Sequence, residues 1–172
     1  MNPVMAEAIT TERLDLLPLR VEHAPEMATV LSDPALHTFI GGSPDTPEAL
    51  RTRYLRMVAG SPDPAVSWCN WVIQLRSEGL LVGTVQATID SADSDPVAEI
   101  AWVVGTPWQG WGIATEATQG LVDWLSQQQV EEIIAHIHPD HGASAAVAEA
   151  AGLTSTGELH NGEIRWSRIV GR

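Results

Sequence analysis

Apolar and polar residues alternate with a period of two in several stretches of the chain, which is typical of strands. Leu14 and Leu16 are the apolar positions of the first stretch, and three longer apolar runs follow in the middle of the chain. Short connections join these three runs, so they predict an antiparallel meander. The predicted strands are Thr11–Arg20, Ser67–Arg76, Leu80–Ile89, Val97–Gly105, Val130–His138, Leu153–Gly157 and Ile164–Val170.

Apolar residues at helical spacing predict four helices between these strands. Thr46 is a typical N-cap with Pro47 directly after it, and Gly152 is a typical glycine just past a helix C-terminus. The helices are predicted at Glu22–Leu31, from Pro47 to just before Gly60, from Gly112 or Ile113 to about Gln129, and at Gly142–Ala151. The element order β-α-α-β-β-β-α-β-α-β-β is that of an α/β or α+β protein.

Composition narrows the function classes. The chain has 172 residues, a length that fits one compact domain. Its net charge is −13, and all 9 basic residues are arginine. The lack of lysine in the sequence excludes Schiff-base chemistry and a P-loop lysine, and the acidic balance argues against nucleic-acid binding. The acidity serves solubility or attracts a cationic acceptor.

Cysteine usage and hydropathy indicate the compartment. The single cysteine, Cys69, allows no internal disulfide and suits a reducing environment. No apolar stretch approaches the roughly 20 residues of a membrane helix, and the first ten residues do not resemble a signal peptide. We therefore expect a soluble cytoplasmic protein.

A glycine-containing segment follows the strand predicted at Val97–Gly105 and leads into a helix. It reads WQGWGIATEA, from Trp108 to Ala117. A helix N-terminus after such a turn presents backbone N–H groups and a favourable dipole to an anion, and glycines let a ligand approach the backbone closely. A dinucleotide-binding fingerprint would need a third glycine at Thr115, so that function is excluded. A phosphate-binding turn and a glycine-softened turn without a ligand both remain open.

Gln109-x-x-Gly112-x-Ala114 resembles the Q/R-x-x-G-x-G/A pyrophosphate-binding signature of the GNAT N-acetyltransferases. The chain is similar to the RimJ/RimL-type branch of this family over nearly its whole length, beginning with the T-E-R-L-x-L-x-x-L pattern at Thr11–Leu19. Three positions depart from that branch. Position 141 is a histidine where the branch has asparagine, Leu153 replaces a phenylalanine, and no tyrosine after Tyr54 can act as the general acid of many relatives.

The resemblance implies a single GNAT N-acetyltransferase domain over residues 1–172, with a core at about 9–170. It implies a mixed, mostly antiparallel twisted sheet of about six or seven strands flanked by about four helices. The implied reaction moves an acetyl group from the cosubstrate acetyl-CoA to a primary amine without a metal, and a homodimer is compatible with it. The residues implied to contact the cofactor are Val103, Val104, Gln109, Gly110, Trp111, Gly112, Ile113, Ala114, Thr115, His141 and Ser144.

The resemblance also implies direct attack of a neutral amine on the thioester. A backbone N–H near Val103 or Val104 would stabilise the oxyanion, and Ser144 matches the serine that protonates the leaving thiolate. Two carboxylates compete as the base. Glu99 lies in an apolar strand, where burial would raise its pKa, and Glu158 lies in an E-x-x-N-G-like segment. Glu99 is slightly favoured, and a purely structural role stays open for all three side chains.

Other candidate residues have simpler interpretations. Glu116 is expected to stabilise the first turn of its helix. His136, His138 and His141 lack a fourth ligand, so a zinc site is not expected. Cys69 is expected to be a buried, inert thiol. Three tryptophans on strands are explained equally well by core packing and by an acceptor pocket; they are Trp68, Trp71 and Trp102.

Two classes of function are compatible with the sequence. The first is an acetyl-CoA-dependent transferase, whose acceptor would be a protein N-terminus or a small-molecule amine. The second is a non-catalytic acyl-CoA-binding or regulatory protein on the same fold. A longer acyl donor is also compatible with the pattern. A working acid and base would distinguish the classes.

Overall fold

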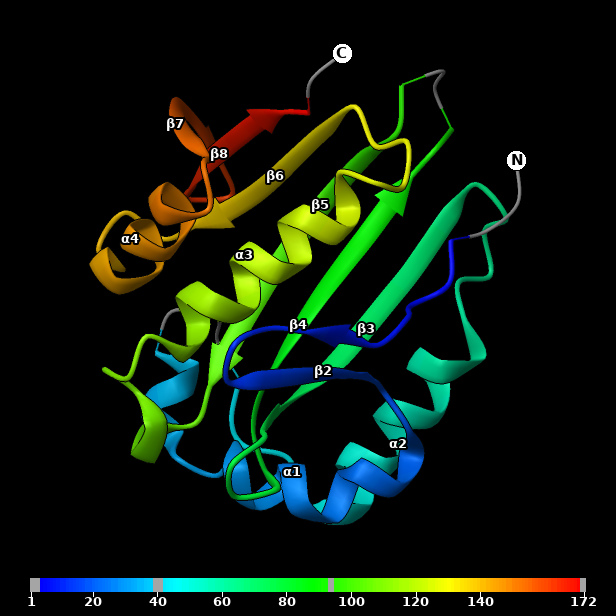
Figure 1. Ribbon diagram of the computed structural model, residues 1–172, viewed down its shortest axis with the longest axis vertical. Helices are drawn as coiled ribbons and strands as arrows, with labels where there is room; N and C mark the ends of the chain where they lie inside the picture. Colours follow the sequence, from blue (N-terminus) through cyan, green and yellow to red (C-terminus); the bar gives the residue numbers. More distant parts are fainter. Residues whose placement is uncertain (1–3, 39–41, 93–94, 171–172) are drawn as a thin grey trace.

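A computed structural model describes residues 4–38, 42–92 and 95–170 of the chain. The described strands form one eight-stranded sheet in the order β1-β2-β3-β4-β5-β6-β8-β7 (Figure 1). Neighbouring strands are antiparallel except β5 and β6, which are parallel. The strands are β1 Ile9–Thr10, β2 Leu14–Pro18, β3 Val66–Leu75, β4 Leu80–Asp90, β5 Val97–Val104, β6 Glu132–Ile137, β7 Thr154–His160 and β8 Glu163–Ile169.

Four α-helices accompany the sheet in the described residues, and none of them is long and apolar enough to cross a membrane. The predicted caps are confirmed, because Thr46 Oγ1 accepts the N–H of Ala49 at 3.1 Å and Gly152 has a φ of +89°. The predicted mixed α/β class is confirmed, with a sheet somewhat larger than expected. The helices are α1 Ala24–Val30, α2 Pro47–Ala59, α3 Ile113–Leu125 and α4 Gly142–Ala150.

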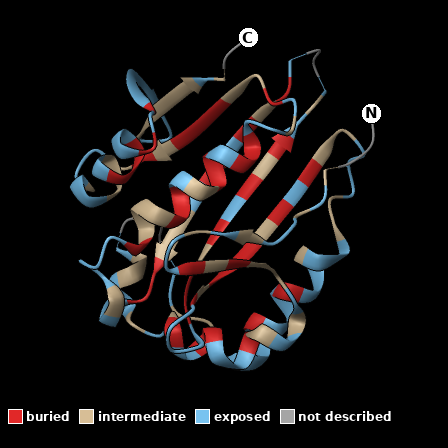
Figure 2. Cartoon of the chain, in the orientation of Figure 1, coloured by how far each residue is buried: buried red, intermediate tan, exposed pale blue. Residues whose placement is uncertain are grey.

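The sheet separates two apolar cores. Trp71 and Ile73 on β3 lie in the larger core, which includes the buried face of α3 (Figure 2). Val72, between them, lies in the smaller core with residues of α1 and α2. This arrangement follows from the pleat, which sends successive side chains of a strand to opposite faces. Apolar side chains on both faces of β3 thus pack against helices on both sides of the sheet.

The central strands β5 and β6 pair only at their beginnings. Val97–Glu99 on β5 pairs with Glu132–Ile134 on β6, and beyond Glu99 the described part of β5 pairs with β4 alone. The strands are parallel because α3 forms the crossover between them. Beyond the paired residues, β5 therefore presents an unpaired edge. We call the space along this edge the β5–β6 gap.

Candidate functional site

Two glycines in the left-handed conformation shape the loop between β5 and α3. φ is +84° at Gly110 and +76° at Gly112, values that side-chain-bearing residues rarely adopt. Gly112 precedes α3, and no side chain caps this helix N-terminus. Glu116 makes the bond to Gly112 O that begins the helix, so the N–H groups of residues 113–115 have no acceptor within it. These groups and the helix dipole can bind an anion at this position.

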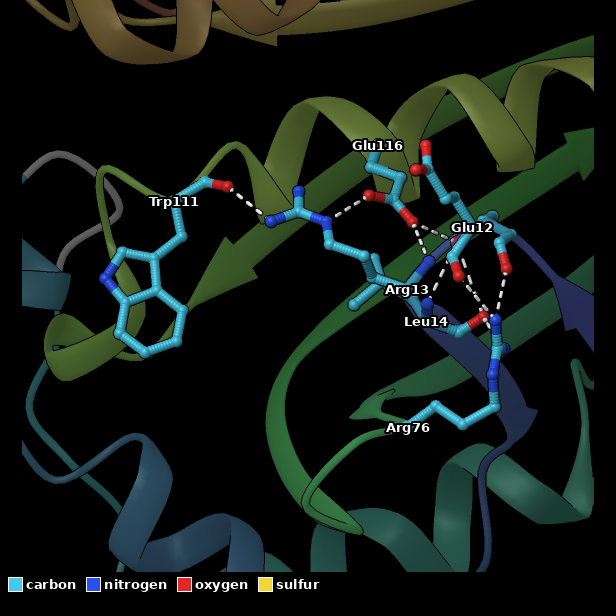
Figure 3. A network of polar contacts seen from close by, with 7 residues as sticks. Glu12, Arg13, Leu14, Arg76, Trp111 and Glu116 are labelled. Atoms are coloured by element: carbon cyan, nitrogen blue, oxygen red, sulfur yellow. Dashed lines mark hydrogen bonds and ion pairs between the residues drawn. The ribbon is translucent and has the colours of Figure 1, made fainter.

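Arg13 and Glu116 attach the beginning of β2 to this loop (Figure 3). Arg13 donates from Nε to Glu116 Oε1 at 2.7 Å and from Nη1 to Trp111 O at 2.8 Å. Glu116 Oε2 also accepts from the Thr11 hydroxyl and from the Arg13 N–H. Burial acts to raise the pKa of Glu116, but these hydrogen bonds together hold it below its ordinary value. Glu116 is therefore an anchor of the loop, which agrees with the structural role predicted for it.

The backbone of β5 offers alternate groups to the β5–β6 gap. Gly105 donates its N–H across the sheet to Val82 O at 2.8 Å, so the main-chain groups of Val103 face β4 in the same way. Those of Val104 face the gap, and Gln109 Nε2 donates to Val104 O at 3.1 Å. Of the two valines predicted to offer an N–H, only Val104 has the right orientation. Gln109 holds the end of the strand.

The N-terminus of α4 brings together two further predicted residues. His141 precedes α4, and its Nε2 lies 3.3 Å from the hydroxyl oxygen of Ser144. Burial, followed by the nearby His138, lowers the pKa of His141. The neutral imidazole can accept the Ser144 proton or donate to its oxygen, depending on the tautomer. The histidine that replaces the expected asparagine thus contacts the proposed acid.

A cavity of about 790 Å³ opens on the face of the sheet that carries α1 and α2. Its wall is mostly apolar, and polar side chains from β3 and β4 contribute to it, which is the usual make-up of a small-ligand site. Residues that border it include Tyr54, Trp68, Asn70, Gln86, Ala101 and Val103. The cavity is therefore separated by the sheet from the large core beneath α3.

The three tryptophans on strands differ in their surroundings, although all of them border this cavity. The Trp68 side chain is 39% exposed. Trp71 is fully buried and makes a T-shaped contact with Trp124 of α3, so its ring belongs to the opposite face. Nε1 of Trp102 is buried and has no hydrogen-bond partner among the described residues. An unpaired buried N–H is costly, which marks Trp102 as a group able to receive a ligand acceptor.

The two candidate carboxylates lie on different strands. The Glu99 side chain is 53% exposed, so the prediction that this carboxylate is buried is wrong. Its Oε2 lies 3.1 Å from Nδ1 of His136, a contact that no pattern in the sequence predicted. Glu158 is exposed on β7, the edge strand of the sheet. The structure thus places Glu99, but not Glu158, beside the β5–β6 gap.

Alternative chemistries find little support in the described geometry. Cys69 is fully buried, and burial raises its pKa to about 11, so it is a poor nucleophile. No group of three potential metal ligands lies within binding distance in the part of the chain that the structure describes. The polar groups of the candidate site are therefore the free N–H groups at the beginning of α3 and the backbone of β5 along the β5–β6 gap. Two side-chain pairs add to them, Glu99 with His136 and Ser144 with His141.

Comparison with known proteins identifies the class to which this geometry belongs. The chain matches the family model described as the acetyltransferase (GNAT) domain over residues 13–154. The chain therefore belongs to the GNAT acetyltransferase family, as the signature at Gln109–Ala114 predicted. No curated protein sequence matches the chain.

Solved structures show the same fold. A GNAT-family acetyltransferase from Bacillus anthracis has a TM-score of 0.79 at 20% identity, covering 95% of this chain and 98% of that one. RimL, a ribosomal L7/L12 alpha-N-protein acetyltransferase solved with coenzyme A, has a TM-score of 0.79 at 19% identity, with coverages of 95% and 98%. The microcin C7 self-immunity acetyltransferase MccE, solved with acetyl-CoA and AMP, has a TM-score of 0.76 at 18% identity, with coverages of 93% and 94%. The predicted likeness to RimL is confirmed for the fold.

Proposed function

We propose that the chain acts as a single acetyltransferase domain that moves an acetyl group from acetyl-CoA to a primary amine in a ternary complex. One observation carries this proposal. The uncapped N-terminus of α3 lies at the end of β5, where β5 no longer pairs with β6, and a cavity opens beside the same strand. A donor can thus approach from the helix and an acceptor from the cavity. The family membership and the coenzyme A complexes of the fold neighbours support this assignment.

The residues present fit coenzyme A. The N–H groups at the beginning of α3 would bind its pyrophosphate, with Gly110 and Gly112 allowing close approach. The pantetheine arm would lie in the β5–β6 gap along Val104 and near His141. Carbonyl oxygens of this arm would give the Trp102 Nε1 the acceptor that it lacks.

The chemistry requires three contributions from the protein. The Val104 N–H would stabilise the negative charge that develops on the thioester oxygen. A carboxylate, Glu99 or Glu158, would participate in removing the proton of the ammonium group so that the amine can attack. Ser144, in contact with His141, would give a proton to the departing thiolate. Glu99 is the better placed of the two carboxylates because it lies beside the gap.

The acceptor is proposed to enter from the cavity. Its volume of about 790 Å³ suits a small amine or the first residues of a peptide. The net charge of −13 would attract a cationic acceptor. The same charge and the lack of lysine make nucleic acid an unsuitable substrate.

A panel of amines tests the proposal. The purified protein is incubated with acetyl-CoA and with peptides that have a free α-amine, polyamines, amino sugars or amino acids, and free thiol is measured. We expect amine-dependent thiol release with at least one class. Binding of acetyl-CoA without thiol release for every class would instead support the non-catalytic acyl-CoA-binding protein.

A further inference from the structure

A group of titratable side chains lies around His136, at the point where β5 and β6 separate. Nδ1 of His136 is 3.1 Å from Glu99 Oε2, and the ring of His160 lies against it with centroids 5.1 Å apart. The His136 side chain is only 16% exposed, whereas that of Glu99 is 53% exposed. The imidazole is thus held between a carboxylate from β5 and a second ring from β7.

The register of the strands places this pair on the face of the sheet that carries the cavity. Glu99 and Ile134 form the last pair between β5 and β6, and His136 follows two residues later. Side chains two residues apart on a strand share a face, so Glu99 and His136 lie on one face. That face of β5 also carries Ala101 and Val103, which border the cavity. The pair therefore lies at the closed end of the β5–β6 gap, near the proposed meeting point of donor and acceptor.

The contact with Glu99 determines which nitrogen of His136 is basic. An ionised carboxylate only accepts hydrogen bonds, so Nδ1 must carry the proton that faces it. In a neutral imidazole the other nitrogen, Nε2, then has a free lone pair. Nε2 makes no hydrogen bond to any residue that the structure describes. His136 is thus arranged as a base that is oriented by a carboxylate, as in other enzymes that combine these two groups.

Other charged or titratable side chains lie around His136, and Glu132 on β6 and Glu163 on β8 share its face of the sheet. His138 directly follows the end of β6, His160 contacts the ring, and Arg165 is the register partner on β8. Arg165 is paired with Glu132 at 3.0 Å, so its positive charge already has a partner. Glu99 is accordingly the charged group in direct hydrogen-bond contact with the imidazole.

We propose that His136 and Glu99 form the proton-accepting pair of the reaction, in which Nε2 of His136 takes the proton of the attacking ammonium group and Glu99 orients the imidazole. This inference rests on the proposed function and makes it more specific. The proton reaches Nε2 directly or through one water. Glu99 thus becomes a positioning residue that acts through His136.

The step balances without any further reagent. The ammonium group loses one proton to His136 Nε2, and the resulting imidazolium is stabilised by the Glu99 carboxylate. The nitrogen lone pair forms the new N–C bond while the C–S bond breaks, and the thiolate receives a proton from Ser144 or water. The nitrogen gives up its second proton as the amide forms, and this proton replaces, through water, the one taken by the thiolate. The imidazolium proton then passes to solvent, which restores the pair.

Two conservative variants separate His136 from Glu99 as the base. In His136→Gln the side chain keeps a polar atom but no longer accepts a proton at this pH, so kcat/KM for the amine should fall by about 10²–10⁴. In Glu99→Gln an amide oxygen still accepts from Nδ1, so the loss should be smaller. The acetyl-CoA-induced thermal shift should be unchanged in both, which shows that each variant is folded. His136→Asn, which retains an N–H donor toward Glu99, serves if His136→Gln does not fold.

The pH profile supplies a readout that a purely structural role would not change. The fall of kcat/KM on the acid side of the profile, its acid limb, follows protonation of the base. An imidazole ordinarily titrates at about pH 6.5 and a glutamate carboxyl at about pH 4.3, so the two kinds of base predict acid limbs at different pH. The wild type should show an acid limb in the pH range where an imidazole titrates. His136→Gln should lack this limb, and its rate should rise only at the higher pH where the amine deprotonates unaided. His138→Gln, a matched loss of an imidazole just after the end of β6, should keep the wild-type limb.

The outcomes are distinguishable. An active wild type, with His136→Gln near wild-type rate or with a larger loss in Glu99→Gln than in His136→Gln, overturns this inference and leaves the proposed function intact. A wild-type protein that acetylates no amine overturns the proposed function and this inference with it. Loss of the acid limb only in the His136 variants supports the pair.

Discussion

At the scale of single residues, the site depends on polar groups whose surroundings come from distant parts of the chain. Glu116 on α3 receives hydrogen bonds from Thr11 and Arg13 near the N-terminus. Trp102 on β5 differs from Glu116, since its buried Nε1 has no hydrogen-bond partner among the described residues. Both cases give measurable consequences, one for stability and one for affinity.

The Glu116→Gln variant should lose stability in a pH-dependent way. Three donors hydrogen-bond the carboxylate, and such bonds to a charged group contribute about 1–3 kcal/mol. Because the folded-state pKa of Glu116 is lowered, its contribution is present above the ordinary glutamate value and is lost as the pH falls through the folded value. Denaturant unfolding at neutral pH should show the loss, and the difference from wild type should shrink in acid.

Glu48 offers a matched control for that experiment. It also lies in the first turn of a helix, α2, but it is exposed. Glu48→Gln should change the free energy of unfolding by less than about 0.5 kcal/mol. Equal effects of the two substitutions would mean that the helix dipole, and not the contacts of Glu116, is responsible.

The Trp102→Phe variant should bind acetyl-CoA more weakly without losing stability. It removes the N–H but keeps most of the apolar surface, so the free protein no longer buries an unpaired donor. If the cofactor arm supplies the missing acceptor, the loss in affinity should be about 0.5–1.5 kcal/mol, roughly two- to tenfold in Kd. Isothermal titration measures it, with Trp68→Phe as the control. Unchanged affinity would show that the cofactor leaves Nε1 unpaired.

At the scale of elements, the beginning of α3 is the feature on which the proposed cofactor binding would depend. Gly112→Val would put a branched side chain at a φ of +76° and in the path of the pyrophosphate. Saturation of the wild type at 100 times Kd should stabilise the fold by about 2.7 kcal/mol, and this gain should be absent in the variant. Thermal melts with and without acetyl-CoA measure the difference.

The Gly112→Val experiment needs a control for the backbone strain that valine introduces at a positive φ, because strain alone lowers the melting temperature. Gly79, in the turn before β4, has a φ of +68° and open space around it, so Gly79→Val carries a similar strain. Both variants should melt below wild type in the absence of ligand, but Gly79→Val should keep the acetyl-CoA shift. A full shift in Gly112→Val would contradict our placement of the pyrophosphate.

The elements themselves could be predicted because each carries a local signal. Alternation defined β3, β4 and β5, and Thr46 with Pro47 defined the beginning of α2. β1 was missed because a two-residue strand has no period to detect. Leu55 and Val58 are apolar residues at helical spacing in α2, yet both are exposed, because the amount of core that covers a helix is set by tertiary packing.

The site could be predicted only in part, for a related reason. The glycine-rich loop is local in sequence, so its position before α3 was readable. The alternation along β5 could not show that the face with Glu99 is left open to solvent. The contact between Glu99 and His136 depends on the parallel register of β5 and β6, which is established through the α3 crossover and leaves no local pattern.

At the scale of the whole molecule, the sheet separates the large core from the cavity, and the β5–β6 gap is an opening in the sheet between them. This architecture would give the proposed donor and acceptor different routes to one strand, which is what a reaction in a ternary complex requires. The net charge of −13 would attract the cationic acceptors that we propose, so polyamines and peptide α-amines are the first to test.

The central claim, acetyl transfer to an amine, is tested most directly by measuring both products of one reaction. The protein is mixed with acetyl-CoA and the best amine of the panel, and free thiol and N-acetylated acceptor are followed together, the second by mass spectrometry. Our account predicts that both appear in equal amounts and only when protein and amine are both present. Thiol release that is independent of the amine, or tight binding of acetyl-CoA with no acetylated product for any amine, would contradict it.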